Sequence, residues 1–240
     1  MSKILLIIPA YNEEESIKRV YNEIVSYNKK NNTNYDVIVI NDGSTDNTEE
    51  ILIENNIPHI SLVSNLGIGG AVQTGYKYAY EKNYDIAIQF DGDGQHDINY
   101  VKNIIKPILN GQADMVIGSR FIDDKANFKS SRIRRVGISI ISFLIKILTG
   151  KKIYDTTSGF RASNKKVIEI FQESYPPEYP EPVTTTRVLK KKLRVSEVHA
   201  KMKERKAGKS SLNSNLWVPV YYMINVCLSI IIEALGGYKI

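Results

Sequence analysis

The chain has 240 residues, enough to bury a full hydrophobic core, and its 42% apolar and 24% charged residues are ordinary for one globular domain. Its one cysteine, Cys227, excludes an internal disulfide framework and fits a reducing compartment. The net charge is +6, but residues 1–118 carry 9 Lys and Arg against 16 Asp and Glu, whereas residues 119–240 carry 23 against 10. A basic second half suits phosphate-bearing ligands. The chain has neither a basic run interleaved with aromatics nor a zinc-ligand spacing, so we expect no nucleic acid partner.

The first half alternates short apolar runs with amphipathic stretches. The apolar runs lack the polar alternation of a half-exposed strand and therefore predict buried strands, at residues 3–8, 37–40, 60–63, 86–90 and 115–118. Between them, apolar residues recur at helical spacing, as in Ile17, Val20 and Ile24. The pattern predicts an α/β fold, with a mainly parallel sheet and helices on both of its faces. The first apolar run is too short for a secretory signal, so we expect a cytoplasmic protein.

Polar segments follow four of these strands, where ligands bind in sheets of this class. They are Pro9–Glu13, Asp42, Asp91–Gln95 and Gly118–Arg120. Because the carboxyl ends of parallel strands share one edge, we expect the four segments to converge.

The third of these segments, Asp91-Gly92-Asp93-Gly94-Gln95, places two carboxylates one residue apart. Like charges this close repel unless a cation or hydrogen-bond donors compensate. A hard divalent ion, bound through carboxylates and substrate phosphates, would supply that compensation. The alternative is a solvated acidic turn that merely ends the strand.

The second half is less regular. Residues 132–148 predict an apolar helix that begins with an arginine cluster, and Asn164 starts a short helix after a polar loop at 155–161. A proline every few residues predicts irregular structure for Tyr175–Pro182. Residues 193–202 alternate like a strand, and a basic loop follows at 203–211.

The last apolar segment, Leu216–Leu235, has three interpretations. Its length approaches that of a membrane span, but Pro219, Asn225 and Glu233 interrupt it. We favour a helix lying at the membrane interface with its aromatic residues at the headgroup level. A core or dimerisation helix is the second interpretation and a true span the third.

Six motifs occur along the chain in an order that resembles glycosyltransferase family 2. They are Ile8–Glu13, Val39–Asp46, Asn65–Ala71, Asp91–His96, Gly118–Arg120 and Thr157–Arg161. Their spacing is most similar to that of the polyprenyl-phosphate sugar synthases, such as the dolichol-phosphate mannose synthases. The resemblance implies a GT-A fold, a nucleotide-diphosphate sugar donor, Mg²⁺ or Mn²⁺ as cofactor, and inversion at the anomeric carbon.

The resemblance also implies roles for residues on the donor side. The nucleotide-sugar pocket would comprise Pro9, Tyr11, Glu13, Ile40, Asp42, Asp91, Gly92 and Asp93. Asp93 would hold the metal together with Gln95. His96 is expected to be structural rather than a metal ligand.

On the acceptor side, Arg120, Arg135 and Ser139 match positions that contact phosphate, and Arg205 matches a late arginine that closes over the diphosphate. Asp93, Arg205 and Arg120 are thus the expected catalytic residues. The chain departs from the family where Ile68 and Ser211 stand in place of frequent lysines, so that one phosphate contact is either missing or supplied by Lys209. The Pro-rich stretch also replaces a helix that bears a Glu in the mannose synthases.

The expected function is transfer of a sugar, with inversion, to undecaprenyl phosphate or another polyprenyl phosphate in cell-surface polysaccharide synthesis. Residues 1–212 would form the catalytic domain and residues 213–240 an apolar helix, with the protein peripheral at the inner face of the cell membrane and a homodimer as an alternative use of that helix. The second hypothesis is transfer to a hydroxyl of a lipid-linked or capsular glycan, which requires a base, and Glu181 and Glu178 are the candidates. The third is a nucleotide-sugar-binding module without catalysis.

Overall fold

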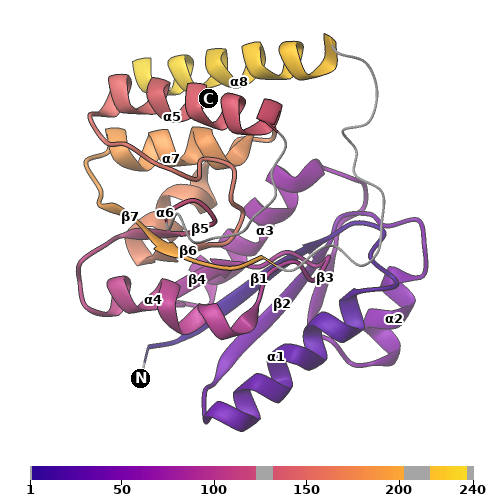
Figure 1. The fold of residues 1–240 in the computed structure, drawn as a ribbon. Helices are drawn as coiled ribbons and strands as arrows, with labels where there is room; N and C mark the ends of the chain where they lie inside the picture. The colour runs from indigo at the N-terminus through magenta and orange to yellow at the C-terminus, as the bar shows by residue number, and fades with distance from the viewer. Residues whose placement is uncertain (1, 123–131, 203–216, 237–240) are drawn as a thin grey trace.

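One sheet organises the protein, which we describe from a computed structural model over residues 2–122, 132–202 and 217–236 (Figure 1). Within these residues the sheet has seven strands in the order β3-β2-β1-β4-β6-β5-β7. The strands are β1 (Ile4–Ala10), β2 (Tyr35–Asn41), β3 (His59–Ser61), β4 (Ile86–Gln89), β5 (Met115–Ser119), β6 (Arg161–Asn164) and β7 (Val195–His199). Only β6 runs antiparallel to its neighbours among the paired strands, so the prediction of a mainly parallel sheet is confirmed.

Helices cover both faces of this sheet, as predicted. One face carries α1 (Ile17–Asn31), α2 (Thr48–Glu54), the short 3₁₀ helix η1 (Ile98–Tyr100) and α4 (Val101–Leu109). The other carries α3 (Gly67–Glu81), α5 (Arg132–Thr149), α6 (Lys165–Glu173), α7 (Pro180–Lys190) and α8 (Trp217–Leu235). Helices α5 and α8 lie beyond α7, farthest from the sheet (Figure 1).

Strand β1 shows why the apolar runs have no polar alternation. It lies between β2 and β4, and all seven of its residues are buried. Leu6 and Ile8 pack into the core under α1, whereas Leu5 and Ile7 pack into the core under α3. A strand covered on both faces needs apolar residues at every position.

Two expectations for the second half are wrong. Helix α7 begins at Pro180, inside the stretch expected to be irregular. Proline is tolerated in the first turn of a helix, where backbone N–H groups have no intrahelical acceptor, so Pro180 and Pro182 start the helix rather than prevent it. The segment expected to pass from a polar loop directly into a helix forms β6, a four-residue strand between β4 and β5.

Candidate active site

The loops after β1 and β2 are joined by hydrogen bonds at the carboxyl edge of the sheet. The Asp42 backbone N–H donates to the Ala10 carbonyl at 2.8 Å, and the Thr45 N–H donates to Asn12 Oδ1 at 2.8 Å. The Glu13 N–H donates to Thr48 Oγ1 at 2.9 Å. Pro9, Tyr11, Glu13, Ile40 and Asp42, the residues expected around the nucleoside, are therefore placed on adjoining strand ends. Tyr11 is 46% exposed, which leaves its ring accessible for stacking.

Asp42 connects this edge to the glycine-rich segment that opens α3. Its carboxylate is buried and accepts the Leu66 N–H at 2.8 Å. Burial raises the pKa of Asp42, and hydrogen bonds from the backbone of Leu66 and Gly67 oppose that shift. Gly43 has φ +64°, and a Cβ there would lie 2.8 Å from the Asn65 nitrogen, so the close approach of the two loops requires glycine.

The acidic loop after β4 is held in a tight turn. Asp93 Oδ1 accepts the Gln95 N–H at 2.9 Å, and Gly94 takes φ +77°. Gly92 lies against β1, since a Cβ there would be 3.1 Å from the Pro9 carbonyl oxygen. Asp91, Gly92, Asp93 and Gln95 thus occupy the same edge of the sheet as the loop after β1.

His96 holds this loop in place through contacts with Asp91. It is buried, its Nδ1 accepts the Asp91 N–H at 2.9 Å, and its Nε2 lies 3.3 Å from Asp91 Oδ2. Its ring stacks on Phe160 with centroids 4.8 Å apart. Burial lowers the pKa of His96 to about 4, so the imidazole is neutral near pH 7. Both ring nitrogens contact Asp91, an arrangement suited to positioning the loop rather than to binding a metal.

The donor set of this loop fits a divalent cation that is shared with a substrate. Within the described residues, no three His, Cys, Asp or Glu side chains gather into a metal-binding cluster. Mg²⁺ usually binds through one or two carboxylates, waters and substrate phosphates rather than in an all-protein cage. The oxygens of Asp93 and Gln95 meet that requirement only together with a diphosphate.

Arg120, expected at the acceptor phosphate, has a carboxylate partner in the structure. It is buried, and its Nε and Nη2 donate to Asp155 at 2.8 Å and 2.7 Å. Nη2 also donates to Thr157 Oγ1 at 2.9 Å. The Asp155 N–H in turn donates to Glu197, whose pKa is raised by burial. The guanidinium of Arg120, which follows β5, is thus fixed by Asp155 and Thr157.

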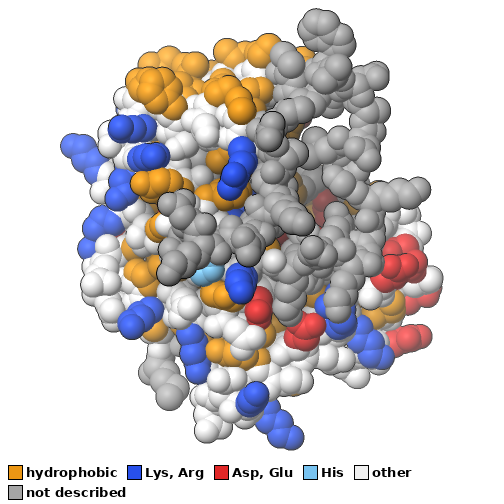
Figure 2. All heavy atoms as spheres, in the orientation of Figure 1, with side chains coloured by type: hydrophobic (Ala, Val, Ile, Leu, Met, Phe, Trp, Pro, Cys, Tyr) orange, Lys and Arg blue, Asp and Glu red, His pale blue; other side chains and the backbone are white. Residues whose placement is uncertain are grey.

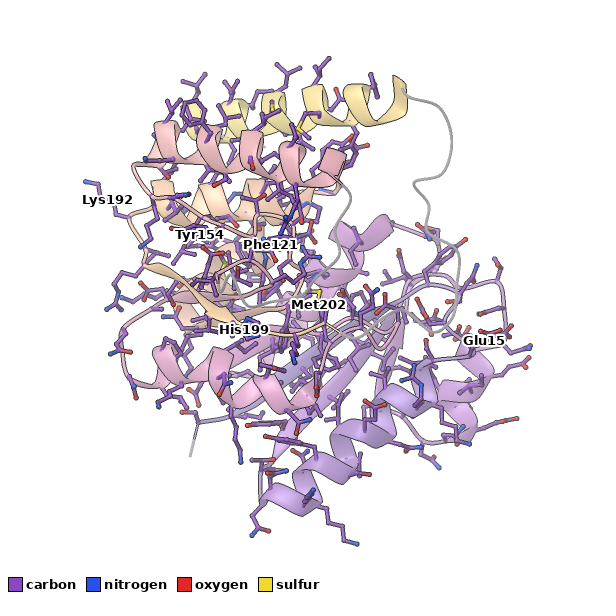
Figure 3. All side chains as sticks on the ribbon, viewed as in Figure 1. Glu15, Phe121, Tyr154, Lys192, His199 and Met202 are labelled. Carbon is purple, nitrogen blue, oxygen red and sulfur yellow. The ribbon has the colours of Figure 1, made fainter. Side chains whose placement is uncertain are left out.

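Arg135 and Ser139 lie on the exposed side of α5, where the Ser139 hydroxyl donates to the Arg135 carbonyl at 2.9 Å. Both line a groove of about 450 Å³, which Phe121 and Tyr154 also border (Figure 3). Arg205, Lys209 and Ser211 lie outside the described residues. Met202, the last described residue before them, pairs with His96 in an isolated β-bridge, so the described chain reaches the acidic loop at Met202.

The buried Arg161 and the partly buried Glu181 are linked by contacts that the sequence analysis did not predict. The Arg161 Nη1 donates to the Glu181 carbonyl at 2.7 Å and to the hydroxyls of Thr184 and Thr185 at 3.0 Å. The Glu181 carboxyl interacts with Gln89 and Asp91, and its burial raises its pKa. The motif Thr157–Arg161 contained the arginine, but its contacts with α7 lie 20 to 24 residues along the chain and left no local signal.

A comparison with known proteins places these motifs in a family. The model of glycosyl transferase family 2 matches residues 5–171. The chain belongs to that family.

Its relatives include several lipid-phosphate enzymes. The chain is 35% identical over 217 residues, 82% of its length and 84% of the relative's, to the UDP-N-acetylglucosamine–dolichyl-phosphate N-acetylglucosaminyltransferase of Methanococcus voltae. It is 26% identical over 225 residues to the undecaprenyl-phosphate mannosyltransferase of Micrococcus luteus, covering 89% of each chain. The resemblance to polyprenyl-phosphate sugar synthases is thereby confirmed.

The fold matches solved structures as well. Glucosyl-3-phosphoglycerate synthase from Mycobacterium tuberculosis, solved in complex with phosphoglyceric acid, aligns over 99% of this chain and 81% of that one, with a TM-score of 0.70 at 20% identity. The same enzyme has been solved with Mn²⁺, UDP-glucose and phosphoglyceric acid, at a TM-score of 0.69 and 19% identity. At this level of identity the match establishes the GT-A fold.

Proposed function

We propose that this protein transfers a sugar, with inversion, from a nucleotide-diphosphate sugar to a polyprenyl phosphate. The observation that carries the proposal is the convergence of Asp42, Asp91 and Asp93 at one sheet edge in a chain related to lipid-phosphate transferases. Because the relative from Methanococcus voltae is named for UDP-N-acetylglucosamine, that donor is the first to test.

The reaction is a direct displacement. A phosphate oxygen of the acceptor forms a bond to the anomeric carbon while the bond from that carbon to the diphosphate oxygen breaks, and the electron pair leaves with the nucleoside diphosphate. An acceptor phosphate with a second pKa of about 6 is already anionic and needs no general base. Asp42 and Asp91 would hold the nucleoside and ribose.

Asp93 and Gln95 would hold Mg²⁺ or Mn²⁺, which neutralises charge on the leaving diphosphate. Arg205 would approach the same diphosphate, since the described chain reaches the acidic loop at Met202. If it stabilises the transition state, Arg205→Ala lowers kcat more than it raises the donor KM. Arg120 would contribute a positive charge whose position is fixed by its pairing with Asp155. Arg135 and Ser139 would bind the acceptor phosphate.

We also propose that the outer face of α5 and α8 rests on a bilayer. The face consists of large apolar side chains that are at least half exposed, namely Val136, Phe143, Ile147, Tyr221, Ile224, Leu228 and Leu235. Figure 2 shows hydrophobic side chains gathered at the top of the molecule, where Figure 1 places α5 and α8, with Lys and Arg side chains below them. Among the described residues, no helix combines the length and apolarity that crossing a bilayer requires. An apolar face bordered by cations suits the surface of an anionic membrane, so we assign the protein to its cytoplasmic side.

The inner side of α8 packs against the core, so the membrane proposal is not well tested by deleting this helix. Val226, Ile230 and Ala234 are buried against the rest of the protein, and Arg187 Nη2 forms an ion pair with Glu233 at 2.7 Å. Deleting residues 213–240 would therefore expose core surface, although we still assign the chemistry to residues 1–212. Substitutions confined to the outer face are the better test.

The double variant Ile224→Ser/Leu228→Ser should bind liposomes less than wild type while keeping its melting temperature. The matched control is Ile53→Ser on α2, an exposed apolar residue on the opposite face of the sheet. If the wild type is a dimer and the double variant a monomer, the face is a dimer interface and the membrane proposal is wrong.

The experiment that tests the transfer itself uses purified protein, Mn²⁺, polyprenyl phosphate in detergent micelles and a panel of nucleotide sugars. We expect one donor to yield a glycosyl-phosphate lipid. If a donor binds but is neither transferred nor slowly hydrolysed, the protein is a non-catalytic binding module.

One observation favours a second candidate function. Glu181 lies on the first turn of α7 beside Gln89 and Asp91, and its raised pKa suits a general base. A hydroxyl acceptor needs such a base, whereas a phosphate does not. Glu181→Gln should retain transfer to a polyprenyl phosphate; loss of transfer only with a hydroxyl acceptor would support the second function.

A further inference from the structure

The groove on α5 carries cations at both of its ends. Arg135 and Ser139 lie near the start of the helix, and Lys146 lies near its end, with Lys152 and Tyr154 on the facing segment. None of the described residues that line this groove of about 450 Å³ is acidic. Within the described part of the chain, neither lysine forms an ion pair with a carboxylate.

The two ends are separated along the helix. Arg135 and Lys146 are separated by eleven positions on the helix, which corresponds to about 16 Å along its axis. A phosphate held between Arg135 and Ser139 would lie at the first end, which leaves Lys146 and Lys152 at the other end available to a second anion.

The segment that faces α5 at the lysine end is held in place by hydrogen bonds. The Ser142 hydroxyl donates to the Ile153 carbonyl, and the Tyr154 N–H donates to Glu197 Oε2 at 2.8 Å, so the facing segment is fixed on both sides. Lys152 Nζ lies 4.4 Å from the centre of the Tyr154 ring, which holds the ammonium beside the groove.

The position of this end indicates which anion it meets. Phe143 lines the groove and also belongs to the outer apolar face, where it is 65% exposed. Lysine and tyrosine side chains at the border of an apolar face are suited to the headgroup layer of a bilayer. A lipid headgroup presents its phosphate at that level, whereas a soluble phosphate gains nothing from the adjacent apolar surface.

We propose that Lys146, Lys152 and Tyr154 form a binding site for the phosphate headgroup of an anionic bilayer lipid, separate from the acceptor phosphate. The proposal rests on the proposed seating of α5 and α8 on a membrane. Its consequence is that anionic lipid orients the groove so that Arg135 faces the headgroup layer from which the acceptor comes.

The test compares Lys146→Gln/Lys152→Gln with the matched control Lys29→Gln/Lys30→Gln, which removes two exposed lysines at the far end of α1. Partition is measured on vesicles of phosphatidylcholine, with and without phosphatidylglycerol. At about 1 kcal/mol per lysine near an anionic surface, the first variant should bind the anionic vesicles about 30-fold less tightly. Its binding to neutral vesicles should equal that of wild type, and the control should keep most of its preference for anionic lipid.

Equal losses in the two variants would mean that only the overall charge matters, and would overturn the site. So would stabilisation of wild type but not of the variant by inorganic phosphate without vesicles, because the ligand would then be a soluble phosphate. Transfer in micelles that lack anionic lipid should be the same for variant and wild type; a loss there would assign the lysines to the acceptor instead. If wild type fails to transfer in micelles but its vesicle preference depends on these lysines, the proposed function fails while this site stands.

Discussion

His96 holds Asp91 at two points, through the 2.9 Å hydrogen bond from the Asp91 N–H to Nδ1 and the 3.3 Å contact between Nε2 and Oδ2. Because the backbone N–H must donate, Nδ1 is unprotonated and Nε2 carries the proton of the neutral ring. The hydrogen bond to Nδ1 therefore selects the tautomer, and the protonated Nε2 lies 3.3 Å from the carboxylate oxygen. His96 is thus a positioning residue for Asp91, acting through both its backbone and its side chain.

Substitutions of His96 should distinguish its hydrogen bond with the Asp91 N–H from the packing of its ring. His96→Phe keeps an aromatic ring against Phe160 but leaves the Asp91 N–H without its acceptor, at a cost of about 1–3 kcal/mol. We expect the donor KM to rise about tenfold, with a smaller change in kcat, because Asp91 is proposed to contact the ribose. His96→Asn, whose Oδ1 can accept the same N–H, should recover part of that loss. Lower thermal stability with an unchanged donor KM would assign His96 a structural role only.

Asp93 should be required for its charge rather than for its hydrogen bond. Asp93→Asn keeps an oxygen for the Gln95 N–H, so the turn should persist. We expect transfer to fall by at least about 100-fold and Mn²⁺-dependent nucleotide binding to be lost, with the circular dichroism spectrum unchanged. Near-normal transfer by this variant at saturating Mn²⁺ would rule out a metal ligand at this position.

The buried pair of Arg120 and Asp155 should be important for stability. Asp155→Asn leaves a buried guanidinium uncompensated, which costs about 3–5 kcal/mol. Denaturant unfolding of the variant measures this loss directly. If the free energy of unfolding is unchanged, Arg120 is not held as we describe, and a direct phosphate contact becomes the better account of it.

A second ion pair should give the protein a pH-dependent component of stability. Hydrogen bonds from Arg194 lower the pKa of Asp114 to about 2, below its ordinary value of 3.8. The unfolded chain therefore binds this proton at a higher pH than the folded chain, so the contribution is complete above about pH 4 and is lost as the pH falls toward 2. Since Arg194 is exposed, solvent screening keeps this contribution small. The difference in unfolding free energy between wild type and Asp114→Asn should be present at pH 7 and vanish near pH 2; a difference independent of pH would contradict the assignment.

The sheet and the gathering of polar segments at its carboxyl edge could be predicted because their signals are local. A run such as Ile4–Ile8, apolar at every position, indicates a strand buried on both faces, and the polar residues that follow must then lie at the strand end. Strand β6 gave no such signal. It has four residues, begins with Arg161 and gains its stability from β4 and β5 on either side.

The partners of the charged residues were beyond the reach of sequence reasoning. Arg120 meets Asp155 across 35 positions, and Glu181 approaches Asp91 only because α7 begins at Pro180. Such pairings depend on how the elements pack, and no spacing along the chain encodes them. Where prolines predicted irregular structure, the chain forms a helix with Glu181 in its first turn.

The most direct test of the central claim compares two acceptors that differ only in the phosphate. With the donor that supports transfer, Mn²⁺ and the same detergent, the protein is given a polyprenyl phosphate or the polyprenol of equal length, and the lipid product is identified by mass. We predict a product with the phosphate only, carrying one sugar linked through that phosphate with its anomeric configuration inverted. Transfer to the polyprenol, or a product with a retained configuration, would contradict the account.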